Sequence, residues 1–273
     1  MHKTGSPVTL TTDFGLLDPY VGIMKGVLLS INPRLSIIDI THQLRPGAIQ
    51  EASALLGEAY PYFPKETIHV VVVDPGVGTT RRAVLVMAND HFFVGPDNGV
   101  FWPIMASNPE ATVLHLVNDR YFLPRISRTF HGRDIFAPVA AHLSLGVKPG
   151  DMGPIIGDPE RLEICEPHEE DGCLVGHVIR VDRFGNLLTN ILKKDLEAFL
   201  AGSLPEIRVG NVMVRGLHET YADVAPGMPL ALIGSAGTLE IAVNRGHIHD
   251  RLEEEGRHML VTVRPLKDGP LEQ

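Results

Sequence analysis

The segment of residues 68–73, IHVVVV, constrains the fold of this chain more than any other feature. Five of its six residues are Ile or Val, without the alternation of apolar and polar residues that is typical of a strand with one wet face. A strand of this kind is buried on both faces, as in the centre of a parallel sheet covered by helices on both sides. The segment therefore favours an α/β fold.

Strand and helix patterns alternate on either side of this segment. Val8–Thr12 is rich in β-branched residues, and apolar residues at helical spacing follow from Tyr20 to Ile31. Asp18 and Pro19 predict the start of that helix, as N-cap and first helical residue. Further strands are predicted at 36–40, 83–87, 91–94 and 112–117, and further helices near 48–60 and at 134–145. The alternation predicts a three-layer α/β/α domain with a mostly parallel sheet.

The pattern changes between Gly146 and Gly172, where Pro, Gly and acidic residues replace the periodic segments. Composition of this kind marks a boundary, and we place the domains at residues 1–160 and 161–273. Beyond it, a short helix is predicted at 193–200, and short strands at 173–181, 206–214, 230–233, 238–243 and 259–263. Short strands separated by glycine predict a small β-barrel or β-sandwich.

The composition argues against several classes of function. The 273 residues carry a net charge of −9 and no Lys/Arg run that could follow a phosphate backbone, so nucleic acid is not an expected partner. No apolar run approaches the roughly 20 residues of a membrane-spanning helix, and the N-terminus lacks a signal-like apolar region. We therefore expect no membrane partner and a cytoplasmic location. Cys165 and Cys173 are too few for a zinc site, and we assign them no function.

Three polar residues stand where ligands gather in α/β proteins. Asp13 follows the first predicted strand, Asp74 follows the buried strand, and His131 precedes the last helix of the first domain. In open α/β sheets, sites lie beyond the carboxyl ends of the strands. Taken singly, each residue is better explained as a turn residue or a residue near a helix cap.

Two segments of the second domain combine small and polar residues. They are DRFGNLLTN at 182–190 and GSAGTLEIAVN at 234–244. Small residues let a ligand approach the backbone closely. Two hairpin turns would explain the same composition, and both interpretations stay open.

Seven motifs, taken together and in order, resemble a known family. They are TTDFG (11–15), DITH (39–42), VDPGVGTTRR (73–82), GPDNGVF (95–101), FHGRD (130–134) and the two segments above. Over residues 8–263 the chain is similar to the S-adenosyl-L-methionine hydroxide adenosyltransferases, which are hydrolase relatives of the fluorinase and chlorinase. The resemblance implies hydrolysis of S-adenosyl-L-methionine to adenosine and L-methionine by attack of water at the ribose C5′. It also implies an α/β/α domain followed by a small β-barrel, in a homotrimer whose sites lie between neighbouring subunits.

The resemblance further implies roles for individual residues. The family's catalytic Asp, Arg and His match Asp74, Arg81 and His131, with Arg82 as the alternative arginine. The implied substrate-binding residues are Asp13 for the ribose, Asp182 for the methionine amine, Asn186 for the adenine, Ser235 for the methionine, and Glu240 and Val243 in the segment that lines the nucleoside.

The residues at positions 74 and 131 favour water over halide as the nucleophile. The halide-using relatives carry tyrosine in place of Asp74 and lack the histidine at His131. A carboxylate would repel a halide, whereas water gains from a proton acceptor. Because the sulfonium leaves as a neutral thioether, the reaction needs no general acid, metal or organic cofactor. The alternatives are 5′-halogenation, a non-catalytic S-adenosyl-L-methionine or nucleoside sensor, and a structural protein without a ligand.

Overall fold

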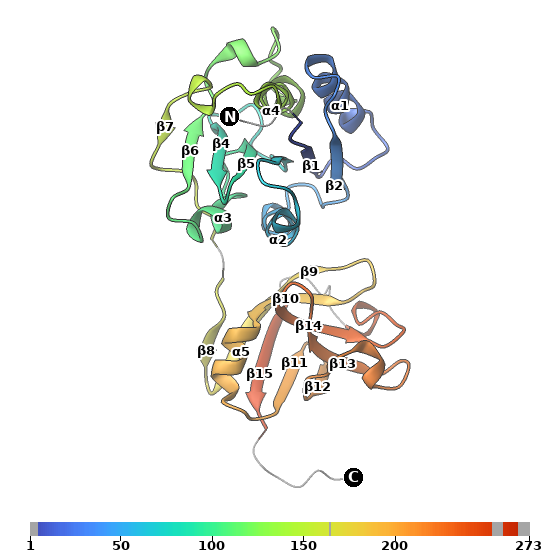
Figure 1. Ribbon diagram of the computed structural model, residues 1–273. Helices are drawn as coiled ribbons and strands as arrows, with labels where there is room; N and C mark the ends of the chain where they lie inside the picture. Colours follow the sequence, from blue (N-terminus) through green and yellow to red (C-terminus); the bar gives the residue numbers. More distant parts are fainter. Residues whose placement is uncertain (1–4, 164, 253–258, 267–273) are drawn as a thin grey trace. The chain divides into compact units, whose positions relative to one another are not determined.

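The computed structural model describes residues 5–163, 165–252 and 259–266 and divides the chain into two compact units. The units are residues 1–163 and 164–273, close to the boundary expected after residue 160. Figure 1 shows that the first unit is layered from helices and strands, whereas the second is mostly β-structure with the helix α5 (Lys193–Leu200). No helix among the described residues is long and apolar enough to cross a membrane.

A seven-stranded sheet forms the centre of the first unit. Its described strands are β1 (Val8–Thr12), β2 (Ile37–Thr41), β3 (Ile68–Val72), β4 (Ala83–Ala88), β5 (His91–Pro96), β6 (Thr112–His115) and β7 (Ile155–Ile156), in the order β2-β1-β3-β5-β4-β6-β7. β2, β1, β3 and β5 are parallel, and β6 has the same direction because it is antiparallel to β4, which is itself antiparallel to β5. The predicted mostly parallel sheet is confirmed.

Helices cover both faces of this sheet. They are α1 (Tyr20–Ile31), α2 (Ile49–Ala59), α3 (Trp102–Ala106) and α4 (Ala137–Ser144). α1 and α4 lie on one face, and α2 and α3 on the other (Figure 1). Val70 of β3 packs in the core with Leu28 of α1, whereas its neighbour Val71 packs in the opposite core with Leu56 of α2. Successive side chains of a strand point to opposite faces, which explains why this segment has no polar face.

The first helix begins one residue later than the sequence predicts. Pro19 occupies the N-cap position, and its carbonyl accepts the first helical hydrogen bond, from the backbone N–H of Ile23 at 2.8 Å. The N-cap makes no side-chain hydrogen bond, so the prediction that Asp18 caps the helix is wrong. The predicted helix at 134–145 is also modified, because a π-helical turn at Gly132–Phe136 precedes α4. Short 3₁₀ turns lie at Tyr60–Tyr62, Asp119–Tyr121, Pro149–Asp151, Tyr221–Asp223 and His249–Arg251.

The second unit is an antiparallel, nearly closed barrel. Its described strands are β8 (His168–Glu170), β9 (Cys173–Val181), β10 (Leu187–Leu192), β11 (Pro205–Val209), β12 (Val212–Arg215), β13 (Pro229–Ile233), β14 (Thr238–Val243) and β15 (Leu260–Pro265). In the order β12-β11-β15-β9-β10-β14-β13, the two end strands contact each other, so the sheet curls toward closure. This arrangement favours the barrel over the sandwich.

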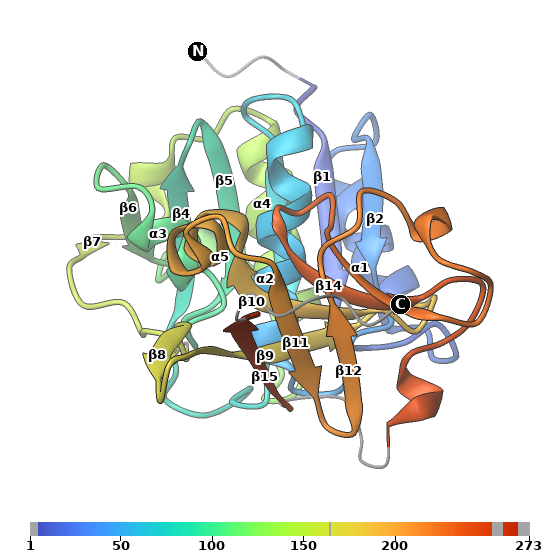
Figure 2. The ribbon, with the colours of Figure 1, turned by 90° about the horizontal axis from the view of Figure 1, so that it is seen from below.

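One strand predicted in the second unit is a hairpin. The segment 206–214 folds as β11 and β12, which pair in antiparallel register and appear as adjacent arrows in Figure 2. Gly210, with a φ of +53°, lies in the turn between them. The prediction of a single strand is wrong here because the turn needs only two residues, Gly210 and Asn211, between two apolar runs.

A buried histidine lies in the sheet of the first unit. His69 of β3 is completely buried, and its Nδ1 lies 2.8 Å from Thr9 Oγ1 and its Nε2 3.3 Å from His91 Nδ1. Its ring stacks on Phe93 at 5.1 Å. Burial, and next the charge of His91, lower the pKa of His69 to about 3. A proton on this ring would be a buried charge without a counterion among these neighbours.

We therefore predict that His69 makes the first unit sensitive to acid. The unfolded chain binds this proton near pH 6.5 and the folded chain only near pH 3. Stability is therefore fully present above pH 6.5 and is lost as the pH falls, by up to about 1.4 kcal/mol per pH unit. Urea unfolding followed through Trp102, the single tryptophan, measures this loss. His69→Gln should lose less stability on acidification than the wild type, whereas His168→Gln, which changes an exposed histidine, should match the wild type. Equal losses in all three proteins would contradict the prediction.

Candidate active site

A cleft lies at the carboxyl edge of the parallel strands. Asp13 directly follows β1 and Asp74 lies two residues beyond β3, and these strands are paired neighbours with Thr12 opposite Val72. The cleft has a volume of about 320 Å³, and Asp13, Asp74 and His131 all line it. The parallel sheet thus brings together residues that are far apart in the sequence, as expected for this class of fold.

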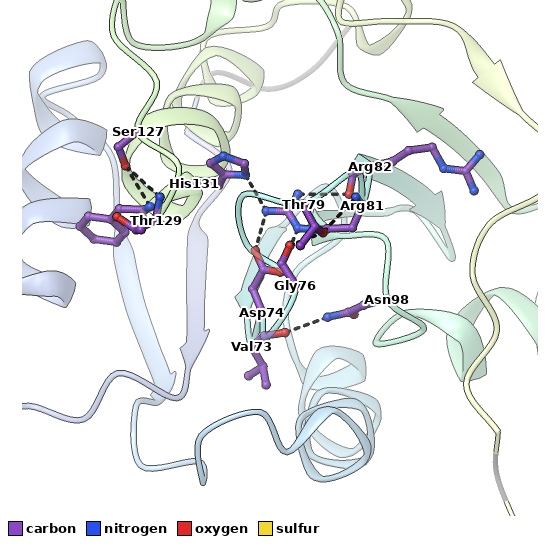
Figure 3. A network of polar contacts seen from close by, with 11 residues as sticks. Val73, Asp74, Gly76, Thr79, Arg81, Arg82, Asn98, Ser127, Thr129 and His131 are labelled. Atoms are coloured by element: carbon purple, nitrogen blue, oxygen red, sulfur yellow. Dashed lines mark hydrogen bonds and ion pairs between the residues drawn. The ribbon is translucent and has the colours of Figure 1, made fainter.

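Arg81 joins Asp74 to His131. Its Nε donates to Asp74 Oδ1 at 2.8 Å, and one terminal nitrogen donates to Asp74 Oδ2 at 2.5 Å (Figure 3). The same terminal nitrogen lies 2.6 Å from His131 Nδ1. The side chains of Arg81 and Asp74 are only 9% and 5% exposed, so this bidentate pair is largely withdrawn from water.

The contact with Arg81 determines the protonation of His131. A guanidinium group can only donate, so His131 Nδ1 must accept, and the neutral ring carries its proton on Nε2. The pKa of His131 is lowered, mainly by burial and then by the charge of Arg81, against weaker opposing effects of Asp74, Asp134 and a hydrogen bond with the backbone of Ser127. Asp74, as a carboxylate acceptor, and the ring of His131 thus both line the cleft.

The neighbouring arginine has a different task. Arg82 extends away from Asp74 and His131 in Figure 3. Its Nε donates to Asp97 Oδ2 at 2.7 Å, and another of its nitrogens donates to Asp158 Oδ1 at 2.8 Å. Of the two candidate arginines, the geometry thus favours Arg81 for the site.

Sequence reasoning missed the residues that hold this site in place. Asn98 donates from Nδ2 to the carbonyl of Val73 at 2.9 Å, next to Asp74. Asp134 is completely buried and accepts from the backbone N–H of Ser127 at 2.8 Å, at the base of the loop that carries His131. Both lie in motifs that carry the family resemblance, GPDNGVF and FHGRD, but the sequence did not indicate what Asn98 and Asp134 do.

Asp13 is fixed on another side of the same cleft. Its Oδ2 accepts from the backbone N–H of Gly47 at 2.8 Å, and Gly47 also lines the cleft. The pKa of Asp13 is raised, chiefly by burial and last by the charge of Asp74, whereas backbone hydrogen bonds act to lower it. Asp13 is therefore a held carboxylate at an electrostatically costly position.

A second cleft of about 530 Å³ lies within the second unit. Asn186 and Val243 line it, together with Phe184 and Tyr221. Asp182 Oδ1 accepts from the backbone N–H groups of Phe184 and Asn186 at 2.9 and 2.8 Å, and its Oδ2 accepts from Asn186 Nδ2 at 3.1 Å. Asp182 therefore fixes the turn and the amide orientation of Asn186.

The remaining predicted residues, Glu240 and Ser235, are not among the residues that line this cleft. Glu240 is buried, and its Oε1 accepts from the Tyr221 hydroxyl at 2.6 Å. Burial, and then Glu240, raise the pKa of Tyr221. Ser235 lies exposed in the turn between β13 and β14. No group of three or more His, Cys, Asp or Glu side chains suited to a metal ion occurs in the described part of the chain.

The contact between Arg81 and His131 gives a prediction that needs no substrate. Because Arg81 lowers the pKa of His131, Arg81→Gln should raise that pKa toward its ordinary value. Nuclear magnetic resonance titration of the His131 ring measures the change, and the wild-type ring should show the Nε2–H tautomer. Arg82→Gln is the matched control and should leave the His131 signal unmoved. An unchanged pKa in Arg81→Gln, or an Nδ1–H tautomer in the wild type, would contradict the geometry.

Comparison with known proteins identifies similar chains. The chain is 39% identical to the (R)-S-adenosyl-L-methionine hydrolase of Salinispora tropica, over 90% of this chain and 93% of that protein. It is equally identical to the protein of that name from Thermus thermophilus, over 90% and 95%. A fluorinase of Actinoplanes is 26% identical, over 89% and 93%.

Two crystal structures share the fold. An uncharacterized conserved protein from Thermotoga maritima superposes with a TM-score of 0.87, and a conserved hypothetical protein from Thermus thermophilus with 0.75. Both are 38% identical to this chain, and each alignment covers 94% of this chain and 99% of the other.

Family models extend these similarities to both units. The model of the SAM hydroxide adenosyltransferase N-terminal domain matches residues 8–153, and that of the C-terminal domain matches residues 176–258. These matches cover most of the chain and agree with the seven ordered motifs. The chain belongs to the SAM hydroxide adenosyltransferase family.

Proposed function

We propose that this protein hydrolyses S-adenosyl-L-methionine to adenosine and L-methionine, with Asp74, Arg81 and His131 as its catalytic group. Relatives named (R)-S-adenosyl-L-methionine hydrolase are 37–39% identical over 69–90% of the chain, whereas fluorinases are more distant. The single observation that carries the catalytic assignment is the linked Asp74–Arg81–His131 arrangement at the first cleft. We extend the (R) form in the relatives' name to the substrate of this chain.

The two groups that face the cleft suit a water molecule. Asp74 accepts a hydrogen bond from one O–H, and His131 Nε2–H donates to an oxygen lone pair, which leaves the second lone pair for attack on C5′. The new O–C5′ bond forms as the C5′–S bond breaks and its electron pair passes to sulfur. The surplus proton leaves through Asp74. Orientation of this kind contributes up to roughly 7–11 kcal/mol, and proton acceptance about 10²–10⁴-fold.

The ion pair refines the argument against halide. Arg81 neutralises much of the field of Asp74, so simple repulsion of an anion is weaker than for a lone carboxylate. The remaining preference is directional, because Asp74 lines the cleft and each of its oxygens has a lone pair beyond the one that accepts from Arg81. Water supplies a hydrogen-bond donor to such a lone pair and a halide ion does not. The arrangement therefore favours hydrolysis over 5′-halogenation, and a sensor without catalysis would not need it.

The substrate contacts are proposals that the geometry refines. Asp13 binds the ribose hydroxyls, and Asn186 and Val243 contact the nucleoside at the second cleft. Asp182 orients Asn186 and still has lone-pair capacity on Oδ2 for the methionine amine. Glu240 holds the Tyr221 hydroxyl by a hydrogen bond, and Tyr221 in turn lines the second cleft. Ser235 is exposed and thus accessible to the methionine. The absence of a cofactor and the cytoplasmic location stay predictions.

Catalysis is tested directly with the substrate. The protein should release adenosine and methionine in equal amounts, and reaction in ¹⁸O-labelled water should place the label in the 5′ hydroxyl. Asp74→Asn and His131→Ala should lower kcat by about 10²–10⁴-fold with little change in KM. Arg81→Lys should also lose turnover because lysine cannot form the bidentate pair, whereas Arg82→Lys should keep it.

Three results would contradict this mechanism. One is label missing from the 5′ hydroxyl, and another is a 5′-halo-nucleoside formed in preference when halide is supplied. The third is near-normal turnover of both Asp74→Asn and His131→Ala, which would leave hydrolysis standing but remove the catalytic assignment.

The proposed assembly is a homotrimer, as the resemblance to the family implies. A cyclic trimer uses head-to-tail interfaces, which allow one subunit to complete the site of the next. Light scattering should give about 89 kDa, three times the 29.8 kDa chain mass. An active monomer in the same experiment would exclude this assembly.

A further inference from the structure

The DITH motif has no role in the mechanism above, yet its histidine lies beside a proposed binding residue. His42 is only 3% exposed and follows β2, next to the turn that carries Asp13. We propose that His42 is a positioning residue that holds Asp13 in place for the ribose, with Thr12 and Asp39 as its partners. The inference rests on the role of Asp13 in the proposed function.

The ring of His42 is held from both sides. Its Nε2 lies 3.0 Å from Asp39 Oδ1, a close electrostatic contact rather than a well-aligned hydrogen bond. Lys25 Nζ donates to the other oxygen of Asp39 at 2.6 Å. An unprotonated Nε2 would set its lone pair against the carboxylate, so the ring proton belongs on Nε2.

This protonation gives the contact with Thr12 a direction. With the proton of the neutral ring on Nε2, Nδ1 is an acceptor, and the Thr12 hydroxyl 2.9 Å away donates to it. The Thr12 oxygen in turn accepts from the backbone N–H of Phe14 at 3.3 Å. Both atoms of the hydroxyl are therefore used, and they fix the backbone on either side of Asp13.

The backbone of His42 adds a second tie between the same two loops. Its carbonyl accepts from the N–H of Gly15 at 2.7 Å, two residues beyond Asp13. The loop then continues to Gly47, whose N–H donates to Asp13 Oδ2 at 2.8 Å. Gly47 has a φ of +73°, which only glycine adopts without strain. His42 thus contacts the turn that carries Asp13 through Thr12 and Gly15, and it begins the loop whose Gly47 binds the Asp13 carboxylate.

The position of Asp13 explains why these ties are needed. Its carboxyl is half-buried and its pKa is raised by burial and by the nearby charge of Asp74. Without restraint, a carboxylate in these surroundings would rotate toward water and away from Asp74. Ties to both flanking segments keep it facing the cleft, where ribose hydroxyls can donate to it.

The test removes the hydroxyl of Thr12 without changing the shape of its side chain. Thr12→Val should weaken adenosine binding by roughly 3- to 10-fold in calorimetry, as for loss of one hydrogen bond. Thr12→Ser keeps the hydroxyl and should stay near the wild-type affinity. Because the ribose contact is the same in the ground state and the transition state, kcat should change little while KM rises. Circular dichroism confirms that each variant is folded.

Two variants of His42 distinguish its contact with Thr12 from its contact with Asp39. His42→Asn places an amide oxygen close to the position of Nδ1 and keeps an acceptor for Thr12, whereas His42→Gln places an amide nitrogen near Nε2 and keeps the donor toward Asp39. Since Thr12 is next to Asp13, His42→Asn should retain more adenosine affinity than His42→Gln. The opposite order would overturn the proposal.

A double-mutant cycle with Asp13→Ala shows whether these ties act through Asp13. Asp13→Ala alone should weaken adenosine binding, and adding Thr12→Val should have little further effect. Fully additive losses would overturn the positioning role while leaving the role of Asp13 intact. Unchanged affinity in Asp13→Ala would remove both. A folded Thr12→Val that binds adenosine normally, or that loses kcat instead of affinity, would overturn the positioning role alone.

Discussion

The bidentate ion pair between Arg81 and Asp74 determines what the first cleft can do. Both side chains are largely buried, and removing one member of such a pair leaves an uncompensated charge that costs about 3–5 kcal/mol. The pair is therefore a fixed part of the site. Arg81 also donates to the carbonyl of Arg82 and contacts His131 Nδ1, and the latter contact leaves the proton of the neutral ring on Nε2. One arginine thus holds both groups that we propose as its catalytic partners, Asp74 and His131.

The parallel sheet places two negative charges side by side, and the loops after its strands stabilise them. Because β1 and β3 are adjacent and end together, the aspartates that follow them, Asp13 and Asp74, are brought to one edge as like charges. A different group stabilises the negative charge of each carboxylate. Asp74 is neutralised by Arg81 from the loop that follows it, and Asp13 accepts the N–H of Gly47 from the loop after β2. The two carboxylates can then face one cleft while differing in how they serve it.

Local pattern predicted the elements well and the contacts between them poorly. The strand β3 follows from a continuous apolar run and the helix α1 from apolar periodicity, and both patterns depend only on neighbouring residues. The hairpin of β11 and β12 was read as one strand because its turn is only two residues long. Adjacent residues of an extended chain point to opposite sides, so sequence alone could not choose between Arg81 and Arg82. That choice depends on Asp97 and Asp158, which are distant in the sequence.

Electrostatics also acts on the substrate at longer range than these contacts. S-adenosyl-L-methionine carries a sulfonium and an ammonium against one carboxylate, and so has a net positive charge, whereas adenosine is neutral and methionine is a zwitterion. A chain with a net charge of −9 attracts the positively charged substrate and exerts no net attraction on the two uncharged products. The same field opposes a halide ion before it reaches the cleft. Long-range attraction of the cation and the proposed hydrogen bond from water to Asp74 therefore both favour hydrolysis, at separate stages of the encounter.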